Sequence, residues 1–155
     1  MRTFRLAGPW LLSLVAFTIF AASKPDFTGK WELDVKRSDF GNLSKPARMT
    51  IESTMQGDAM HSVQTTYIEQ ESQSAEFTWY VDDKRHSSDK PVPGYSVTRW
   101  EDATLVSDRQ SNDGAYKETI RMSLSTDGKT ATETIETKNP SGANKEKLIW
   151  HRKIQ

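Results

Sequence analysis

The C-terminal third of the chain decides the fold. It reads TLVSDRQ at residues 104–110, AYKETIRMSLS at 115–125, TATETIETK at 130–138 and KEKLIWHRKI at 145–154. Each segment contains the threonine, β-branched or aromatic residues that favour strands. The links between the segments have only four, four and six residues. Parallel strands need crossovers of a dozen or more residues, so these strands are predicted to run antiparallel.

The same pattern extends toward the N-terminus. Short strand-forming runs alternate there with Gly, Asp, Asn and Pro at a spacing of roughly 8–12 residues, and no segment has a helical period. The sequence therefore predicts an all-β, up-and-down antiparallel meander that closes into a barrel of eight to ten strands, because closure removes the open edges of a sheet. The remaining predicted strands lie at residues 28–36, 49–55, 59–69, 74–81 and 95–100. Residues 85–94 are predicted to form a weak strand or a loop, because Pro91 and Pro93 cannot donate to a ladder.

Residues 1–23 have the features of a secretory signal peptide. Arg2 and Arg5 give a basic start, residues 6–20 are apolar, and residues 21–23 are small. This order is typical of a cleaved signal, and the apolar run is shorter than the ~20 residues of a spanning helix, although an uncleaved anchor is the alternative. The predicted organisation is a signal peptide at 1–23 and one domain at 24–155. We expect an exported protein, periplasmic or secreted, without a stable membrane anchor after cleavage.

Composition excludes several classes of partner and site. The 155 residues contain 21 basic and 21 acidic side chains and no cysteine. A nucleic-acid-binding protein needs a clear excess of Lys and Arg, so we expect no nucleic-acid partner. The absence of cysteine excludes a disulfide framework, a thiolate zinc site and a catalytic thiol.

Two stretches carry a resemblance to a known superfamily. FTGKWEL at 27–33 resembles the GxW opening strand of the calycins, which include lipocalins, fatty-acid-binding proteins and bacterial lipocalin-like domains. LIWHR at 148–152 resembles the closing strand of these barrels, in which an arginine packs over the tryptophan. The resemblance implies a bacterial lipocalin-like secreted domain. It also implies a structural latch between Trp31 and Arg152, since a guanidinium on an indole face gains roughly 0.5–2 kcal/mol; the alternative is a plain core aromatic and a solvated charge.

Strand alternation provides the candidate ligand-binding residues. It places Phe77 with Trp79, Tyr116 with Glu118, and Trp150 with Leu148 on shared faces that we expect to line the interior. Arg99 is expected to point inward with its strand and to offer a cation to a carboxylate ligand, as in fatty-acid-binding relatives, although no Arg-x-Tyr pair closes the last strand. The alternative is a filled core in which Glu118 pairs with Arg99. The candidates are Phe77, Trp79, Arg99, Tyr116, Glu118 and Trp150.

Catalytic and metal-binding patterns are scarce. His61, His86 and His151 are far apart, and no serine lies in a GxSxG elbow. We therefore expect no enzyme activity, no metal and no cofactor. The predicted function is that of an exported, monomeric lipocalin-like protein that binds a small apolar or amphipathic molecule inside the barrel. The alternative is an envelope or secreted interaction module, an inhibitor or assembly factor, with a filled, ligand-free barrel.

The signal peptide generates the first prediction. The exported product should begin near Lys24 and be soluble, because the apolar run ends in the small residues that a signal peptidase reads. Intact-mass measurement of the exported protein checks this expectation. A full-length species retained in the membrane fraction would contradict it.

Overall fold

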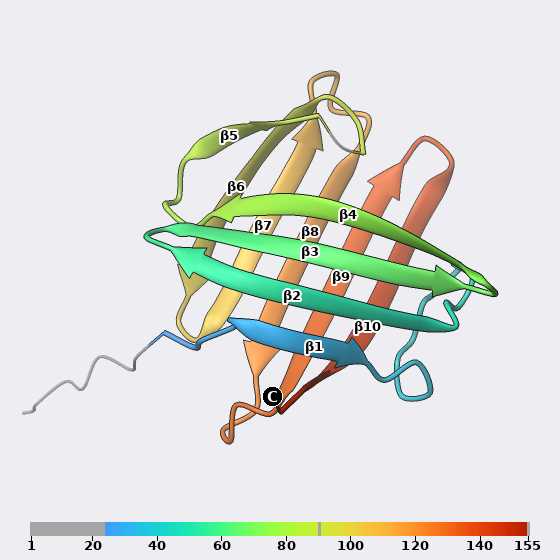
Figure 1. The fold of residues 1–155 in the computed structure, drawn as a ribbon. Helices are drawn as coiled ribbons and strands as arrows, with labels where there is room; N and C mark the ends of the chain where they lie inside the picture. Colours follow the sequence, from blue (N-terminus) through green and yellow to red (C-terminus); the bar gives the residue numbers. More distant parts are fainter. Residues whose placement is uncertain (1–23, 90, 155) are drawn as a thin grey trace, which may run out of the picture.

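The computed structural model describes residues 24–89 and 91–154, and the predicted signal peptide lies outside these residues (Figure 1). Within these residues, ten strands form one antiparallel sheet in the order β4-β3-β2-β1-β10-β9-β8-β7-β6-β5. The predicted all-β meander is confirmed. The strands are β1 (Gly29–Leu33), β2 (Arg48–Gln56), β3 (Ala59–Ile68), β4 (Glu71–Tyr80), β5 (Arg85–Ser88), β6 (Gly94–Glu101), β7 (Thr104–Ser111), β8 (Lys117–Leu124), β9 (Thr130–Asn139) and β10 (Gly142–Arg152).

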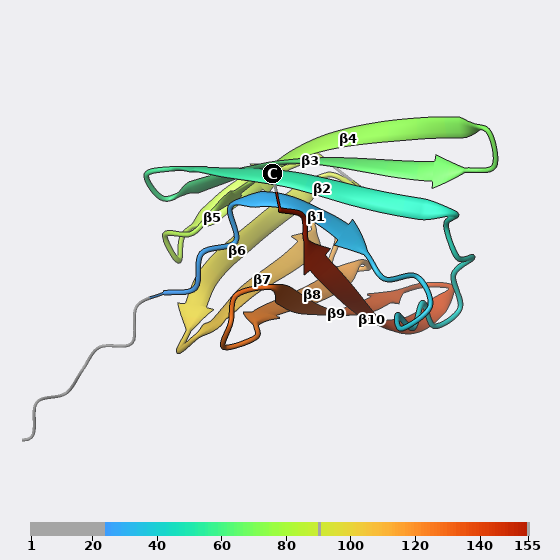
Figure 2. The ribbon, with the colours of Figure 1, turned by 60° about the horizontal axis from the view of Figure 1, so that its bottom comes forward.

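The first and last strands pair and curl the sheet into a nearly closed barrel. β1 pairs with β2 on one side and with β10 on the other, with Trp31 opposite Arg152. The strand order ends at β4 and β5, where the barrel is left open. In Figure 2, β2, β3 and β4 form one layer that crosses over β6–β10, and β1 joins the two layers at one side.

Several strand boundaries differ from the sequence-based expectation. β10 begins at Gly142, three residues before the predicted start, because the β9–β10 ladder continues to a tight turn in which Asn139 Oδ1 accepts a hydrogen bond from the Ser141 amide at 2.8 Å. β1 ends at Leu33, before the predicted residue 36. The Asp34 carbonyl accepts bonds from the amides of Arg37 and Ser38, which turns the chain away from the sheet.

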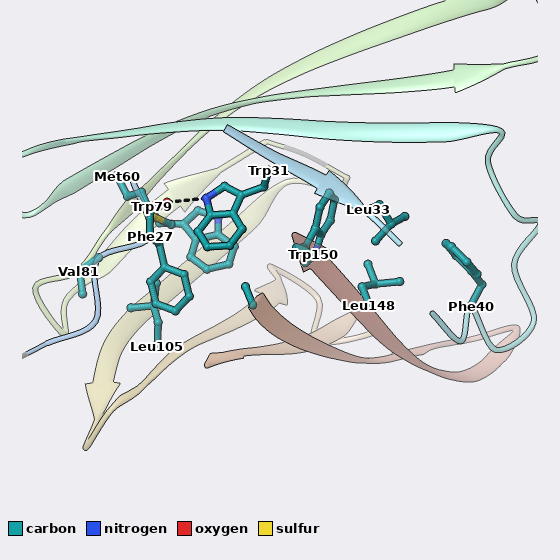
Figure 3. Close-up of a cluster of buried hydrophobic side chains, with 11 residues drawn as sticks. Phe27, Trp31, Leu33, Phe40, Met60, Trp79, Val81, Leu105, Leu148 and Trp150 are labelled. Carbon is teal, nitrogen blue, oxygen red and sulfur yellow. Dashed lines mark hydrogen bonds between the residues drawn. The ribbon is translucent and has the colours of Figure 1, made fainter. Parts of the chain in front are cut away.

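The two ends of the barrel differ. In a meander, the links that follow odd-numbered strands all lie at one end, and the other links lie at the opposite end with the N-terminal segment. At this second end, aromatic and aliphatic side chains close the barrel, and the remaining void is only about 20 Å³. We call this packed region the floor; it consists of Phe27, Trp31, Leu105, Ala131 and Trp150 (Figure 3).

Trp31 and Arg152 meet at the floor. The Arg152 guanidinium carbon lies 4.3 Å from the centre of the Trp31 ring. Its nitrogens donate to the carbonyls of Thr28, Asp26 and Gly128, the last at 2.9 Å, so one side chain joins the N-terminal segment to the β8–β9 link. The indole Nε1 of Trp31 donates to the Phe27 carbonyl at 2.9 Å.

This contact generates the second prediction. Trp31→Ala should lower the free energy of unfolding by about 3–5 kcal/mol, and Arg152→Ala by about 1.5–3 kcal/mol, because both leave buried partners without their contacts. The double mutant should show a coupling energy above about 0.5 kcal/mol in urea titrations. Lys153→Ala, which removes an exposed side chain, is the control. Strictly additive losses would show that the two side chains are independent.

Candidate functional site

A cavity of about 770 Å³ lies between the two layers of the barrel, next to the floor. Its outer rim, here called the mouth, is formed by Leu43, Pro91 and Asn139. Leu43 and Pro91 belong to the β1–β2 and β5–β6 connections, and Asn139 is the last residue of β9, so all three lie where an odd-numbered strand ends or is left. The cavity therefore reaches the end of the barrel opposite the floor. Its volume is in the range of small-molecule sites, roughly 300–1,000 Å³.

Most of the cavity wall is apolar. Strand alternation directs Phe77 and Trp79 of β4 inward, with ring centres 6.0 Å apart. Alternate positions of β8 and β9 face them across the interior. The apolar lining side chains are Ile51, Met60, Phe77, Trp79, Ile120, Met122 and Ile135.

The most buried ionisable group of the cavity is the carboxylate of Glu133 on β9. Only 7% of this residue is exposed, and its Oε2 accepts a hydrogen bond from the Trp150 indole at 2.9 Å. Burial, reinforced by the negative charges of Glu146 and Glu118, raises the pKa of Glu133 to about 7. The neutral indole donor only partly offsets this increase.

Nearer the mouth, three side chains form a hydrogen-bonded group. Arg109 Nη1 lies 3.4 Å from Glu118 Oε1, and the Tyr116 hydroxyl donates to Glu118 Oε2 at 2.7 Å. Burial and the adjacent carboxylate raise the pKa of Tyr116 far above its ordinary value, so this hydroxyl stays a donor. Arg109 Nε is buried and has no hydrogen-bond partner.

A third carboxylate, that of Glu146 on β10, completes the polar side of the cavity. Its Oε1 accepts a hydrogen bond from the Asn144 side chain at 3.2 Å. Burial raises the pKa of Glu146, and the charge of Glu118 adds to the effect. We refer to Glu118, Glu133 and Glu146 as the acidic wall.

The structure brings together most of the residues that the sequence singled out. Phe77, Trp79, Tyr116 and Glu118 line the cavity. Trp150 does not line the cavity but lies in the floor. Its indole is hydrogen-bonded to Glu133, which does line the cavity. Their part in ligand binding stays a prediction.

The expected inward orientation of Arg99 is wrong. Its guanidinium binds Asp108 at 2.7 Å and Glu101 at 2.6 Å, and none of these three residues lines the cavity. The neighbouring Thr98 is the inward residue of β6, 2% exposed and bonded to Ser107 at 2.9 Å. The sequence favours the face of Arg99 because Tyr95 and Val97 share it, whereas the small Thr98 carries no apolar signal. Glu118 consequently pairs with Arg109 and not with Arg99.

Arg109, Glu133 and Glu146 also line the cavity, although the sequence did not single them out. Glu133 lies in the run TETIET, in which Glu133 and Glu136 both precede a threonine and cannot be separated by residue type. Their positions relative to Ile135 could have distinguished them, since Glu133 shares its face and Glu136 does not. Within residues 24–89 and 91–154, no group of acidic or histidine side chains is arranged to hold a metal, and no helix is long and apolar enough to span a membrane.

Comparison with solved structures identifies the fold. The chain resembles a Schistosoma mansoni fatty-acid-binding protein in complex with arachidonic acid, with a TM-score of 0.57, 15% identity, and coverage of 83% of this chain and 96% of the other. It resembles zebrafish ileal bile-acid-binding protein complexed with cholic acid, with a TM-score of 0.54, 15% identity, and coverage of 82% and 98%. A secretory abundant heat soluble protein from Ramazzottius varieornatus matches with a TM-score of 0.61, 9% identity, and coverage of 84% and 98%.

These similarities show the fold, a nearly closed antiparallel β-barrel like those of the fatty-acid- and bile-acid-binding proteins, as the opening and closing strands led us to expect. In sequence, neither a protein-family model nor a curated protein matches the chain. The assignment to a bacterial subgroup stays a prediction.

Glu133 generates the third prediction. Its pKa is higher in the folded chain, about 7, than the ordinary 4.5, so the stability that its protonated form contributes is present below about pH 4.5 and is lost as the pH rises through 7. Glu133→Gln keeps an acceptor for Trp150 without the charge. Its free energy of unfolding should exceed that of the wild type by about 3 kcal/mol at pH 8 and by little at pH 4.5.

Urea denaturation at the two pH values measures this difference. Glu136→Gln is the matched control, because Glu136 lies on the same strand with its side chain 61% exposed beside Lys145. An equal increase in the free energy of unfolding at both pH values, or the same increase in the control, would show that Glu133 is not a buried group that ionises between them.

Proposed function

We propose that this protein binds a small apolar or amphipathic molecule inside its barrel. The observation that carries the proposal is the cavity of about 770 Å³, walled largely by aliphatic and aromatic side chains and closed at one end by the floor. Binding of an apolar ligand to such a surface is favoured by about 25 cal/mol per Å² of apolar area removed from water. The resemblance to barrels described with arachidonic acid and cholic acid supports the same use of the interior.

The same cavity disfavours the alternative of an interaction module with a filled barrel, because a filled interior would leave no space between Phe77, Ile120 and Ile135. A role as a binding protein rather than an enzyme also agrees with the fatty-acid- and bile-acid-binding neighbours. We further propose, on the strength of the N-terminal sequence pattern, that the protein is exported to the periplasm or secreted.

Binding of an uncharged apolar probe provides the fourth prediction. N-phenyl-1-naphthylamine should bind saturably with a dissociation constant in the micromolar range, about −8 kcal/mol, seen as an increase in probe fluorescence. Ile120→Trp should weaken this binding at least about tenfold, because the larger side chain occupies the space that the probe needs.

Val63→Trp is the control, since Val63 lies on the outer face of β3 and is 42% exposed. It should leave the dissociation constant within about twofold of the wild type. Far-UV circular dichroism verifies that both variants keep their strands. Binding weaker than about millimolar, or an equal loss in both variants, would overturn the proposed site.

A further inference from the structure

The charges inside the cavity are unbalanced. The acidic wall contributes three carboxylates, from β8, β9 and β10, whereas Arg109 on β7 is the one cation among the described residues that line the cavity. Arg109 already lies 3.4 Å from Glu118. One positive charge is therefore matched by one negative charge, and two carboxylates remain. A fourth carboxylate, that of Glu76 on β4, lines the same cavity but is exposed.

The two remaining carboxylates have only neutral hydrogen-bond donors. Glu133 is bonded by the Trp150 indole at 2.9 Å, and Glu146 is bonded by the Asn144 amide at 3.2 Å. Within the part of the chain that the structure describes, no lysine, arginine or histidine forms an ion pair with either of them. Glu118 and Glu146 instead act on Glu133 as like charges, and burial and this repulsion together raise its pKa.

A buried carboxylate without a counterion is unfavourable unless it binds a proton or meets a cation. In this barrel the apolar lining can hold a hydrocarbon body while a positive head group approaches Glu133 and Glu146. A carboxylate ligand would add a further negative charge to the same space. Arg109 keeps one donor without a partner, its buried Nε, but its positive charge is already balanced by Glu118.

We infer that the ligand class of this barrel is an apolar molecule with a cationic head group, such as a protonated long-chain amine, and not a fatty acid. This inference rests on the proposed function, because it names the head group of a ligand bound in the same cavity. The enclosed volume, about 770 Å³, limits the ligand to a small molecule.

Three probes with the same ten-carbon chain test the inference: decylamine, decanol and decanoate. Calorimetric titration at pH 8, with each probe below its micelle concentration, keeps the amine protonated, since an alkyl ammonium has a pKa near the ~10.4 of lysine, and keeps the acid ionised. Decylamine should bind at least about tenfold more tightly than decanoate, with decanol between them.

The outcomes separate the two proposals. Decanoate or decanol binding as tightly as decylamine would overturn the cationic ligand class and leave the ligand-binding barrel standing. Failure of all three probes to bind tighter than about millimolar would overturn both proposals.

Variants of the acidic wall test whether its carboxylates recognise the ammonium group of decylamine. Glu133→Gln and Glu146→Gln should each weaken decylamine binding about tenfold and leave decanol binding within about twofold, which also reports that the cavity is intact. Glu136→Gln, on the outward face of β9, should change neither. If the two cavity variants bind decylamine as tightly as the wild type, the carboxylates do not recognise the head group and the inference is wrong.

Discussion

The pairing of the first strand with the last is the constraint on which the rest of the structure depends. A ten-strand meander has no interior until its two ends meet, and here β1 joins β10 with Trp31 opposite Arg152. The guanidinium covers the indole and binds three carbonyls of flanking segments, so the closing contact and the floor of the barrel are the same structure. Everything above the floor, including the cavity, takes its shape from this closure.

Two features of the interior have opposite effects on the free energy of unfolding. Its aliphatic and aromatic lining favours burial, while the acidic wall places carboxylates where desolvation is costly. A hydrophobic residue at Glu133 would fill the same position without that cost. A buried polar group that lowers stability is a common feature of functional sites, which are maintained at the expense of folding free energy. The acidic wall is therefore better explained by the proposed cationic ligand than by a contribution to the stability of the barrel.

The sequence predicted the fold more completely than the site. Short links and period-two alternation were enough for ten antiparallel strands, because both depend on local chemistry. Element ends were less certain, as at Gly142, where a run of Asn, Pro, Ser and Gly conceals a tight turn. Aromatic residues such as Phe77 and Trp79 identified their own inward face. The charged residues Arg99 and Glu133 did not, since strand register decides whether a charge points to solvent or to the cavity, and register is a long-range property.

The central claim, that a ligand occupies the barrel interior, is tested most directly by contacts between a bound molecule and individual side chains. Protein labelled at its isoleucine methyl groups and mixed with decanol or decylamine should give intermolecular nuclear Overhauser effects from the alkyl chain to Ile51, Ile120 and Ile135, which line the cavity. Ile68, 54% exposed outside the cavity, should show none. Effects confined to Ile68, or spread evenly over inner and outer methyl groups, would contradict a binding site inside the barrel.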